Sequence, residues 1–427
     1  MAETSDSSAR IAFSYPSFRL YQIARFLTIT ASEMQSVAVG WQIYDITHRP
    51  LDLGLVGLAQ FLPPFLLFLF AGHAADRFQR KHIIMICFGA FALCSSLLFA
   101  ISLREVRSVA PIYAVLLLIG VVRAFNGPAG QAFMPLLVPE KHFPNAVAWG
   151  SSIFMAATIL GPSLGGVIYG ITGNAKDVYI SAAITFAISV LLVAAIKLQV
   201  QQRPRHTISM ESVLAGFKYV LRTKLVFGAI SLDLFAVLLG GAVALLPVYA
   251  REILAIGPRG LGILRAAPGV GAVITAIVLA HWPLKRRAGL KMLWCVAGFG
   301  VFTVVFGISR NVYLSLFALL MIGATDMVSV IVRSTMVQLA TPDEMRGRVS
   351  AVNMIFIGAS NEFGQFESGL TAQWFGTVPA VVVGGIGTLL VVAAYSWFFP
   401  ELRRVDQLSA EDIRVPEEPA LTADPND

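Results

Sequence analysis

The chain has 427 residues, of which 56% are apolar and 13% are charged, and its mean hydropathy is +0.74. Soluble domains carry about 25% charged residues, so this composition excludes a soluble protein and indicates a polytopic membrane protein. The formal net charge of +7 does not indicate a nucleic-acid partner, because the basic residues lie in short segments between apolar runs, as topology signals do.

The reactive residue types show no pattern of an enzyme or of a metal site. Cys87, Cys94 and Cys295 lie inside apolar runs, with neither disulfide nor metal-ligand spacing. The sequence contains no Walker A phosphate loop and no H-E-x-x-H zinc motif. We therefore expect no enzymatic activity, no cofactor and no metal, and an energy source other than bound ATP.

Twelve apolar runs are long enough to cross a bilayer, because about 20 helical residues span its hydrocarbon core. Charged residues or Pro and Gly clusters separate them. The runs lie at 18–44, 53–75, 82–103, 110–135, 146–170, 178–199, 225–250, 259–281, 288–308, 311–339, 347–371 and 376–400. The expected fold is an all-α membrane protein with twelve transmembrane helices in two six-helix bundles.

The polar segments divide the chain into four parts. Residues 1–199 and 225–404 would form the two bundles, and 200–224 a linker with a basic amphipathic helix on the membrane surface. Residues 405–427 are acidic and are expected to be disordered. Lys and Arg are about three times as numerous on the face of the N-terminus as on the opposite face, which predicts cytoplasmic termini.

The two halves repeat each other in sequence. Pro, Gly and charged positions coincide at nearly one offset, although chance alignment of apolar helices is the alternative explanation. A shift of 205 residues aligns Tyr44 with Tyr249, Gly57 with Gly262, Pro63 with Pro268 and Arg80-Lys81 with Lys285-Arg286, and a shift of 203 aligns Gly161 with Gly364 and Gly166 with Gly369. Such a repeat predicts a substrate site between the halves, near the bilayer midplane.

Ionisable residues inside the spans are costly unless they face a cavity or a partner, so each is a functional candidate. Spans 1, 4, 7 and 10 carry Glu33, Arg123, Asp233, Asp326 and Arg333. From their depths along the helices we expect Glu33, Arg123 and Asp326 to form a central cluster. Asp233 and Arg333 would form a second pair. A carboxylate there would bind a proton when its arginine withdraws and release it when the arginine returns. The alternative is that these residues are static pairs between helices.

Span 11 adds two carboxylates, Glu362 and Glu367, which point to roughly perpendicular faces of a helix. Glu362 has polar neighbours and is the better candidate for the cavity, with a packing role as the alternative. Arg265 aligns with Gln60 in the repeat and is either an outer-cavity residue or a surface anchor.

The segment between the second and third spans has the pattern G-x-x-x-D-R-x-x-R-K, formed by Gly72, Asp76, Arg77, Arg80 and Lys81. Gly72 would allow close backbone approach, and Asp76 would meet the N-terminus of the next helix. The pattern resembles the cytoplasmic loop between helices 2 and 3 of the major facilitator superfamily. The resemblance implies that these five residues latch the two halves together; a positive-inside anchor is the alternative.

Three further stretches resemble the same superfamily. Arg123 to Gly127 is similar to its R-x-x-Q-G motif, whose Arg is implicated in proton coupling. Gly161-Pro162-Ser163-Leu164-Gly165-Gly166 resembles the end of its antiporter motif, where small residues pack helices closely and Pro162 bends the span. Thr341 to Val349 resembles the branch that includes the bacterial enterobactin exporter and drug-efflux proteins.

Together these features predict a monomeric, multi-pass protein of the bacterial inner membrane. We expect a proton-coupled antiporter that exports a small amphipathic organic molecule, siderophore- or drug-like, by alternating access. Its partners would be the substrate, protons and the lipid bilayer. Proton-coupled uptake or lipid flipping is the alternative within transport, and a non-transporting membrane scaffold or sensor is the alternative of another class.

Overall fold

A computed structural model describes residues 11–104, 108–197, 210–284, 286–408 and 413, without the side chains of 68, 69, 76 and 210–213. Within these ranges the regular elements are all helical. Several helices begin with proline in their first turn, as Pro16 and Pro50 do, because its fixed φ suits that position and its missing N–H costs nothing there.

The first half of the chain forms six long helices after a 3₁₀ turn, η1 (Ile11–Ser14). They are α2 (Pro16–Thr47), α3 (Pro50–Arg77), α4 (Arg80–Leu103), α5 (Ala110–Phe133), α6 (Phe143–Thr172) and α7 (Ala175–Ala194), with the short 3₁₀ turns η2 (Met134–Leu136) and η3 (Glu140–His142) between α5 and α6.

The second half repeats this plan after a linker helix, α8 (Met210–Arg222). Its elements are α9 (Lys224–Leu239), η4 (Ala242–Leu245), α10 (Leu246–Val248), η5 (Tyr249–Ile253), α11 (Gly257–His281), α12 (Ala288–Ile308), α13 (Val312–Leu339), α14 (Asp343–Phe375), α15 (Thr377–Phe398) and the short α16 (Pro400–Arg404).

The described helices confirm the all-α membrane fold. In the described part of the chain, ten helical segments have the length and hydropathy needed to cross a membrane. The two remaining predicted spans are α2 and α14, which have 32 and 33 residues but are more polar than the other ten. Their polar residues include Glu33 and Glu362, so the two helices that fall short in hydropathy carry candidate site residues.

The seventh span is broken, although the apolar run 225–250 predicts one continuous helix. Helix α9 ends at Leu239, and the chain passes through Gly240-Gly241, a 3₁₀ turn and the π-helical turn η5 before α11. Two successive glycines weaken the helix, and the absent side chain lets Gly241 approach the Gly364 backbone of α14. Pro247 then removes a further helical donor.

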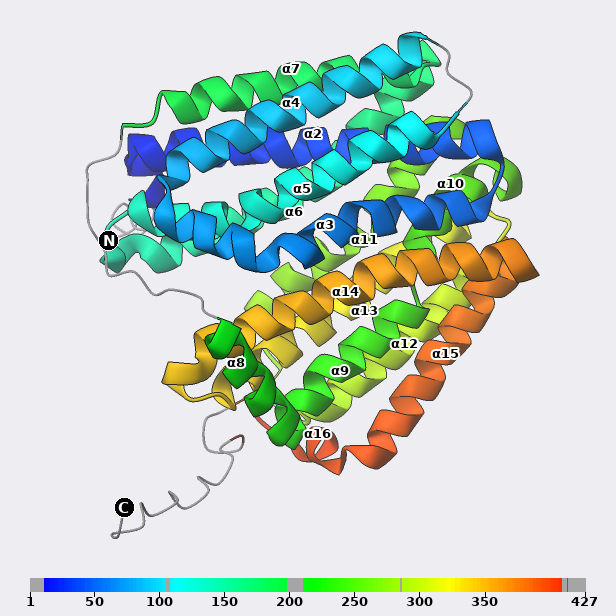
Figure 1. The fold of residues 1–427 in the computed structure, drawn as a ribbon. Helices are drawn as coiled ribbons and strands as arrows, with labels where there is room; N and C mark the ends of the chain where they lie inside the picture. Colours follow the sequence, from blue (N-terminus) through cyan, green and yellow to red (C-terminus); the bar gives the residue numbers. More distant parts are fainter. Residues whose placement is uncertain (1–10, 105–107, 198–209, 285, 409–412, 414–427) are drawn as a thin grey trace.

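The two halves lie side by side, with the first above the second in Figure 1. We call the helix ends near Pro16 and Arg404 the terminal face, and the opposite ends the distal face. Figure 1 shows the halves close together where α2 turns into α3, at the distal face, and diverging towards the terminal face. The halves pack mainly through α6 on α11 and α3 on α14.

The linker helix α8 packs on the terminal ends of α9 and α14. Tyr219 donates a hydrogen bond to the Ala340 carbonyl at 2.7 Å, and Val220 is fully buried. Leu214, Phe217 and Leu221 are exposed at helical spacing, which gives α8 an uncovered apolar stripe. The part of the linker at 198–209 lies outside the described residues.

The segment after α16 is ordered at its start, whereas the composition predicts a disordered tail from residue 405. The amides of Ala288 and Gly289 donate to the carbonyls of Asp406 and Val405, at 3.0 and 3.1 Å. The Asp406 carboxylate accepts the Arg287 amide at 2.9 Å. These contacts satisfy free N–H groups at the start of α12, which explains why this part of the tail folds back. Residues 409–412 and 414–427 lie outside the described residues.

Candidate functional site

Four charged side chains, two from each half, are connected by electrostatic interactions. Glu33 and Arg123 lie on α2 and α5, and Arg265 and Glu362 lie on α11 and α14. The charge of Arg265 interacts with those of the other three, and the charge of Glu362 interacts with both arginines. We call these four residues the central cluster. With both carboxylates ionised it is formally neutral.

Direct contacts position the members from the second half. Arg265 Nη2 donates a hydrogen bond to Ser36 Oγ on α2 at 2.7 Å, which joins the two halves. Glu362 Oε2 accepts from Gln365 Nε2 at 3.2 Å. The same oxygen would lie 2.9 Å from a Cβ placed at Gly57 on α3, so the glycine makes room for this carboxylate.

A small cavity inside the first half extends this polar region. Its polar lining comes from α2, α3 and α5, namely Ser32, Gln35, Ser36, Gln60 and Arg123. Gln35 accepts a hydrogen bond of 2.5 Å from Ser95 on α4, which fixes one wall. Ser36 therefore lines the same cavity as Arg123, and it also accepts the hydrogen bond from Arg265.

Asp326 is not part of this cluster in the present conformation, although its depth predicts a place beside Arg123. Among the described residues it makes no ion pair. Helix α13 packs on α9, α11 and α12, which all belong to its own half. Asp326 and Arg123 are related by the repeat and lie on opposite halves, so they meet only if the halves bring α5 and α13 together.

Asp233 on α9 and Arg333 on α13 form an ion pair, as predicted from their depths. Both residues are buried, with 8% and 4% of their surface exposed, respectively. Both helices belong to the second half, so the pair connects helices within one bundle. Its part in coupling stays a prediction.

Glu367 lies apart from the central cluster. It accepts a hydrogen bond from Thr371 Oγ1, one turn along α14, at 2.8 Å. The structure therefore separates the two carboxylates of this helix, with Glu362 towards Arg123 and Arg265 and Glu367 towards its own helix.

The predicted latch adopts a different local structure from the expected charged hinge. Helix α3 continues through Gly72 to Arg77, and no atom lies within 4 Å of a Cβ placed at Gly72. Arg80 donates to the Ala132 carbonyl at 3.2 Å. Lys81 donates to the carbonyls of Ala194 and Ile196 at 2.8 and 2.7 Å.

These bonds place the two cations at the ends of α5 and α7, where free carbonyls and the helix dipole favour positive charge. They stay within the first half, because the halves diverge at this face (Figure 1). Arg77 is exposed, and the Asp76 side chain lies outside the described part. A latch between the halves stays a prediction for another conformation.

The glycines of the antiporter-like stretch lie at two helix crossings. On one side, Gly161 and Gly165 pack on α2: a Cβ placed at Gly165 would lie 2.8 Å from Met34 Cα. On the other side, Gly166 packs on α11 of the opposite half, where a Cβ would lie 2.7 Å from the Pro258 carbonyl oxygen. Pro162 is buried inside α6 between these glycines.

The repeat-related position shows the same packing. A Cβ placed at Gly369 on α14 would lie 2.9 Å from Gly54 Cα on α3, again across the two halves. Small residues at both crossings let the helix backbones touch. The α6–α11 and α3–α14 interfaces are therefore symmetry-related surfaces on which the halves meet.

At the distal face, polar contacts tie the two halves together. Asp45 of α2 forms an ion pair with Arg251 of η5, and the Arg251 guanidinium lies 5.9 Å from the ring centre of Trp41. Tyr44 Oη donates a hydrogen bond of 2.5 Å to Glu252 Oε1. We call Tyr44, Asp45, Arg251 and Glu252 the distal tie.

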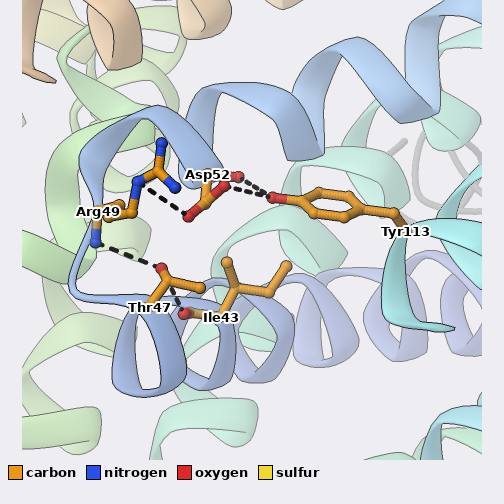
Figure 2. Close-up of polar contacts among 5 residues, drawn as sticks. All are labelled: Ile43, Thr47, Arg49, Asp52 and Tyr113. Carbon is orange, nitrogen blue, oxygen red and sulfur yellow. Dashed lines mark hydrogen bonds and ion pairs between the residues drawn. The ribbon is translucent and has the colours of Figure 1, made fainter. Parts of the chain in front are cut away.

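The neighbouring loop is held to its own half. Tyr113 on α5 donates to the Asp52 carbonyl oxygen at 2.8 Å, and the Asp52 carboxylate lies 3.9 Å from Arg49 Nε (Figure 2). Thr47 Oγ1 donates to the Ile43 carbonyl at 3.0 Å and accepts from the Arg49 amide at 3.3 Å (Figure 2). Hydrogen bonds and an ion pair therefore hold the loop that follows the distal end of α2, next to the distal tie.

A second concave surface lies at the terminal end of the second half. This cavity has a volume of about 700 Å³, and its lining, as far as the described residues show, is mostly apolar with one cation. The lining residues are Leu279, Pro283, Leu284, Arg286, Ile331, Gln407 and Leu408.

Sequence reasoning left Arg265 undecided and did not identify Ser36 or the distal tie. The alignment of Arg265 with the polar Gln60 was a usable signal, because Gln60 lines the small cavity and Arg265 binds Ser36, which lines it too. The distal tie had a weaker signal: Tyr44 is a repeat position, but its partner Glu252 is an ordinary loop residue in sequence.

The sequence matches a family described as transmembrane secretion effector over residues 7–425. Among curated proteins, enterobactin exporters EntS of Shigella boydii serotype 18 and of Escherichia fergusonii are each 27% identical over 393 residues. In both cases the alignment covers 92% of this chain and 94% of the relative.

Solved structures share the fold at low sequence identity. A bacterial homologue of the human lysosomal transporter Spinster superposes with a TM-score of 0.73 at 12% identity, covering 94% of this chain and 99% of that one. A transporter of the POT family gives 0.72 at 10% identity, covering 90% and 96%. A bacterial homologue of the iron transporter ferroportin gives 0.67 at 14% identity, covering 89% and 98%.

Proposed function

Since the chain belongs to the transmembrane secretion effector family of the major facilitator superfamily, we propose that it exports a small amphipathic organic molecule in exchange for protons. The protein is a multi-pass membrane transporter of this superfamily and not an enzyme. The direction, the proton coupling and the substrate class are the proposed parts. The protein would act as a monomer in a bacterial inner membrane, with both termini in the cytoplasm.

The observation that carries the proposal is the central cluster. Inside this membrane protein, Arg265 interacts electrostatically with the other three members, and Glu362 interacts with both arginines. Charges at such a depth are expensive unless they serve a cavity or a partner. Since the members sit on different halves, a rocking motion changes their distances, and with them the charge interactions through which proton binding would be coupled to the motion.

The substrate class is proposed from the names of the relatives. The relatives at 27% identity are named as enterobactin exporters, so enterobactin is the first substrate to test.

The test uses purified protein in liposomes that contain a pH-sensitive dye. Enterobactin, a cationic dye and an antibiotic are added in turn, and internal pH is followed for the wild type, Glu362→Gln and Glu367→Gln. We expect enterobactin-dependent proton movement that falls at least about tenfold in Glu362→Gln. Glu367→Gln is the matched control, because it lies on the same helix outside the cluster, and it should keep wild-type activity.

Substrate flux without proton movement in the wild type would contradict the coupling and leave a uniporter. Proton movement in the same direction as the substrate would indicate uptake by symport in place of export by antiport. Equal activity of both variants would exclude Glu362 from coupling.

A further inference from the structure

The loop between α11 and α12 is held differently from its repeat mate in the first half. In the first half, Arg80 and Lys81 at the start of α4 donate to carbonyls at the ends of α5 and α7. In the second half, the carbonyl and the carboxylate of Asp406 accept the amides of Ala288 and Arg287, at 3.0 and 2.9 Å respectively. The segment after α16 therefore holds this loop, where two cations hold the first one.

This arrangement leaves the side chains of two arginines without a partner in the described part of the chain. Arg286 and Arg287 are both exposed, and neither guanidinium forms an ion pair or a hydrogen bond with a described residue. The Asp406 carboxylate accepts the Arg287 amide and forms no ion pair with either guanidinium. Two adjacent cations at the terminal face are thus available to an anion from outside the chain.

One of these cations lines the cavity of about 700 Å³ at this end of the second half. Among the described lining residues, Arg286 is the only one with a charged side chain. The apolar wall of the cavity comes from α11, the loop, α13 and the segment after α16, and includes Leu279, Leu284, Ile331 and Leu408. A ligand in this cavity would meet one positive charge beside an apolar wall.

The lining changes from apolar to charged along the helix axes. Ile331 lies about 12 Å inside the terminal end of α13 and Leu279 about 3 Å inside that of α11, at ~1.5 Å per residue. Arg286 follows in the loop beyond α11. Trp282, which is 72% exposed, lies between them, and tryptophan is typical of the membrane–water interface. The apolar wall thus lies at the depth of acyl chains and the cation at the depth of headgroups.

We propose that this cavity binds an anionic phospholipid of the surrounding bilayer, such as phosphatidylglycerol. Arg286 would bind the phosphate, because a guanidinium matches phosphate oxygens in geometry and charge. The apolar wall would contact the upper part of an acyl chain, which a free phosphate ion lacks. Basic pockets between membrane helices bind acidic headgroups in this way. The inference is independent of export and of proton coupling.

The experiment measures lipid binding to the full-length protein in detergent by native mass spectrometry. Phosphatidylglycerol and phosphatidylethanolamine with the same acyl chains are titrated separately, and the bound fraction gives the dissociation constant of the first lipid. The wild type is compared with Arg286→Gln, Leu408→Glu and Arg310→Gln. Arg310 is the matched control, because it is an exposed loop arginine of the same half but lies at the distal face.

We expect the wild type to bind phosphatidylglycerol more tightly than phosphatidylethanolamine. Arg286→Gln should weaken binding of phosphatidylglycerol about fivefold, the effect of one cation near an anionic headgroup, and leave phosphatidylethanolamine unchanged. Leu408→Glu brings a negative charge to the apolar wall and should weaken binding of phosphatidylglycerol as well. Arg310→Gln should bind both lipids as the wild type does.

Equal affinity of the wild type for the two lipids would overturn the inference, as would wild-type binding of phosphatidylglycerol by Arg286→Gln or by Leu408→Glu. Displacement of the lipid by inorganic phosphate at an equal concentration would indicate an anion site that does not use the apolar wall, and would also contradict it. Arg286-dependent lipid binding by a protein that moves no protons in liposomes would leave the inference standing and refute the proposed antiport.

Discussion

At the scale of single residues, burial decides which charges matter most for stability. Asp233 and Arg333 form a buried pair, whereas Asp343 and Arg346 form an exposed one, with 78% and 50% of their side chains accessible. Solvent-exposed ion pairs contribute little to stability, because screening by solvent and the loss of side-chain entropy oppose them. A buried ion pair contributes little net free energy to folding. Removing one of its partners is nevertheless costly, because the remaining buried charge then has no partner.

This contrast gives the first prediction. Arg333→Ala should lower the free energy of unfolding by about 3–5 kcal/mol, because Asp233 is left buried without a partner. Arg346→Ala, the exposed control, should lower it by under ~1 kcal/mol. Thermal unfolding in one detergent measures both variants.

The double variant Asp233→Leu with Arg333→Met tests whether the pair has a further role. It should regain most of the stability, since apolar residues can replace a buried ion pair. Full transport by this stable variant would make the pair purely structural, and lost transport would support a part in coupling. Equal free energies of unfolding for Arg333→Ala and the wild type would contradict the expected cost of an unpaired Asp233.

At the scale of helices, the glycines of α6 and α14 determine how closely the halves approach. Gly166 and its repeat mate Gly369 lie at symmetry-related crossings, each against the backbone of the opposite half. A moving transporter must slide or rock on these surfaces. A methyl group at either crossing therefore affects packing and motion together.

The second prediction concerns Gly166→Ala. The new Cβ would lie 2.7 Å from the Pro258 carbonyl oxygen and 2.9 Å from Gly262 Cα, which requires a backbone shift. Overpacking of this kind costs about 1–3 kcal/mol. We expect a lower unfolding temperature and slower substrate flux in liposomes.

The matched control is Gly89→Ala on α4, where no atom lies within 4 Å of the added Cβ. It should be neutral or more stable by up to roughly 1 kcal/mol, because Ala favours a helix over Gly. A fully active and stable Gly166→Ala variant would show that the crossing tolerates the methyl group.

At the scale of the whole molecule, the present conformation is joined at the distal face and at the centre. The distal tie and the Arg265–Ser36 bond cross between the halves. Nearer the terminal face, Gln131 on α5 reaches Met354 Sδ on α14 at 3.5 Å, a weak contact. Opening at the distal face therefore requires breaking the distal tie.

The third prediction reverses one charge of this tie. Arg251→Asp places two carboxylates opposite each other and should open the distal face, and adding Asp45→Arg should restore the pair in the opposite sense. Spin labels at Ile171→Cys and Tyr313→Cys, 67% and 82% exposed near that face, report the distance between the halves.

We expect longer distances in the single variant and a return towards the wild-type distribution in the double variant. The effect should weaken at high salt, since the pair is partly exposed. Unchanged distances in the single variant would show that other contacts, such as Tyr44 with Glu252, close this face without the ion pair.

The sequence alone determines the fold class and the inventory of buried charges. Apolar runs of about 20 residues have to become spanning helices in lipid, because each backbone polar group needs an internal partner. The repeat, carried by residues such as Gly166 and Gly369, identifies the two halves. The depth of Asp233 and Arg333 along their helices was sufficient to predict their pairing within one half.

The tertiary structure decided which charges meet across the halves. Arg265 with Ser36, and Tyr44 with Glu252, belong to segments that no local pattern relates to each other. The break at Gly240 also needed the structure, since it depends on the packing of Gly241 against α14. The common reason is that helix periodicity and desolvation act within one segment, whereas contacts between halves depend on their relative position, which changes during transport.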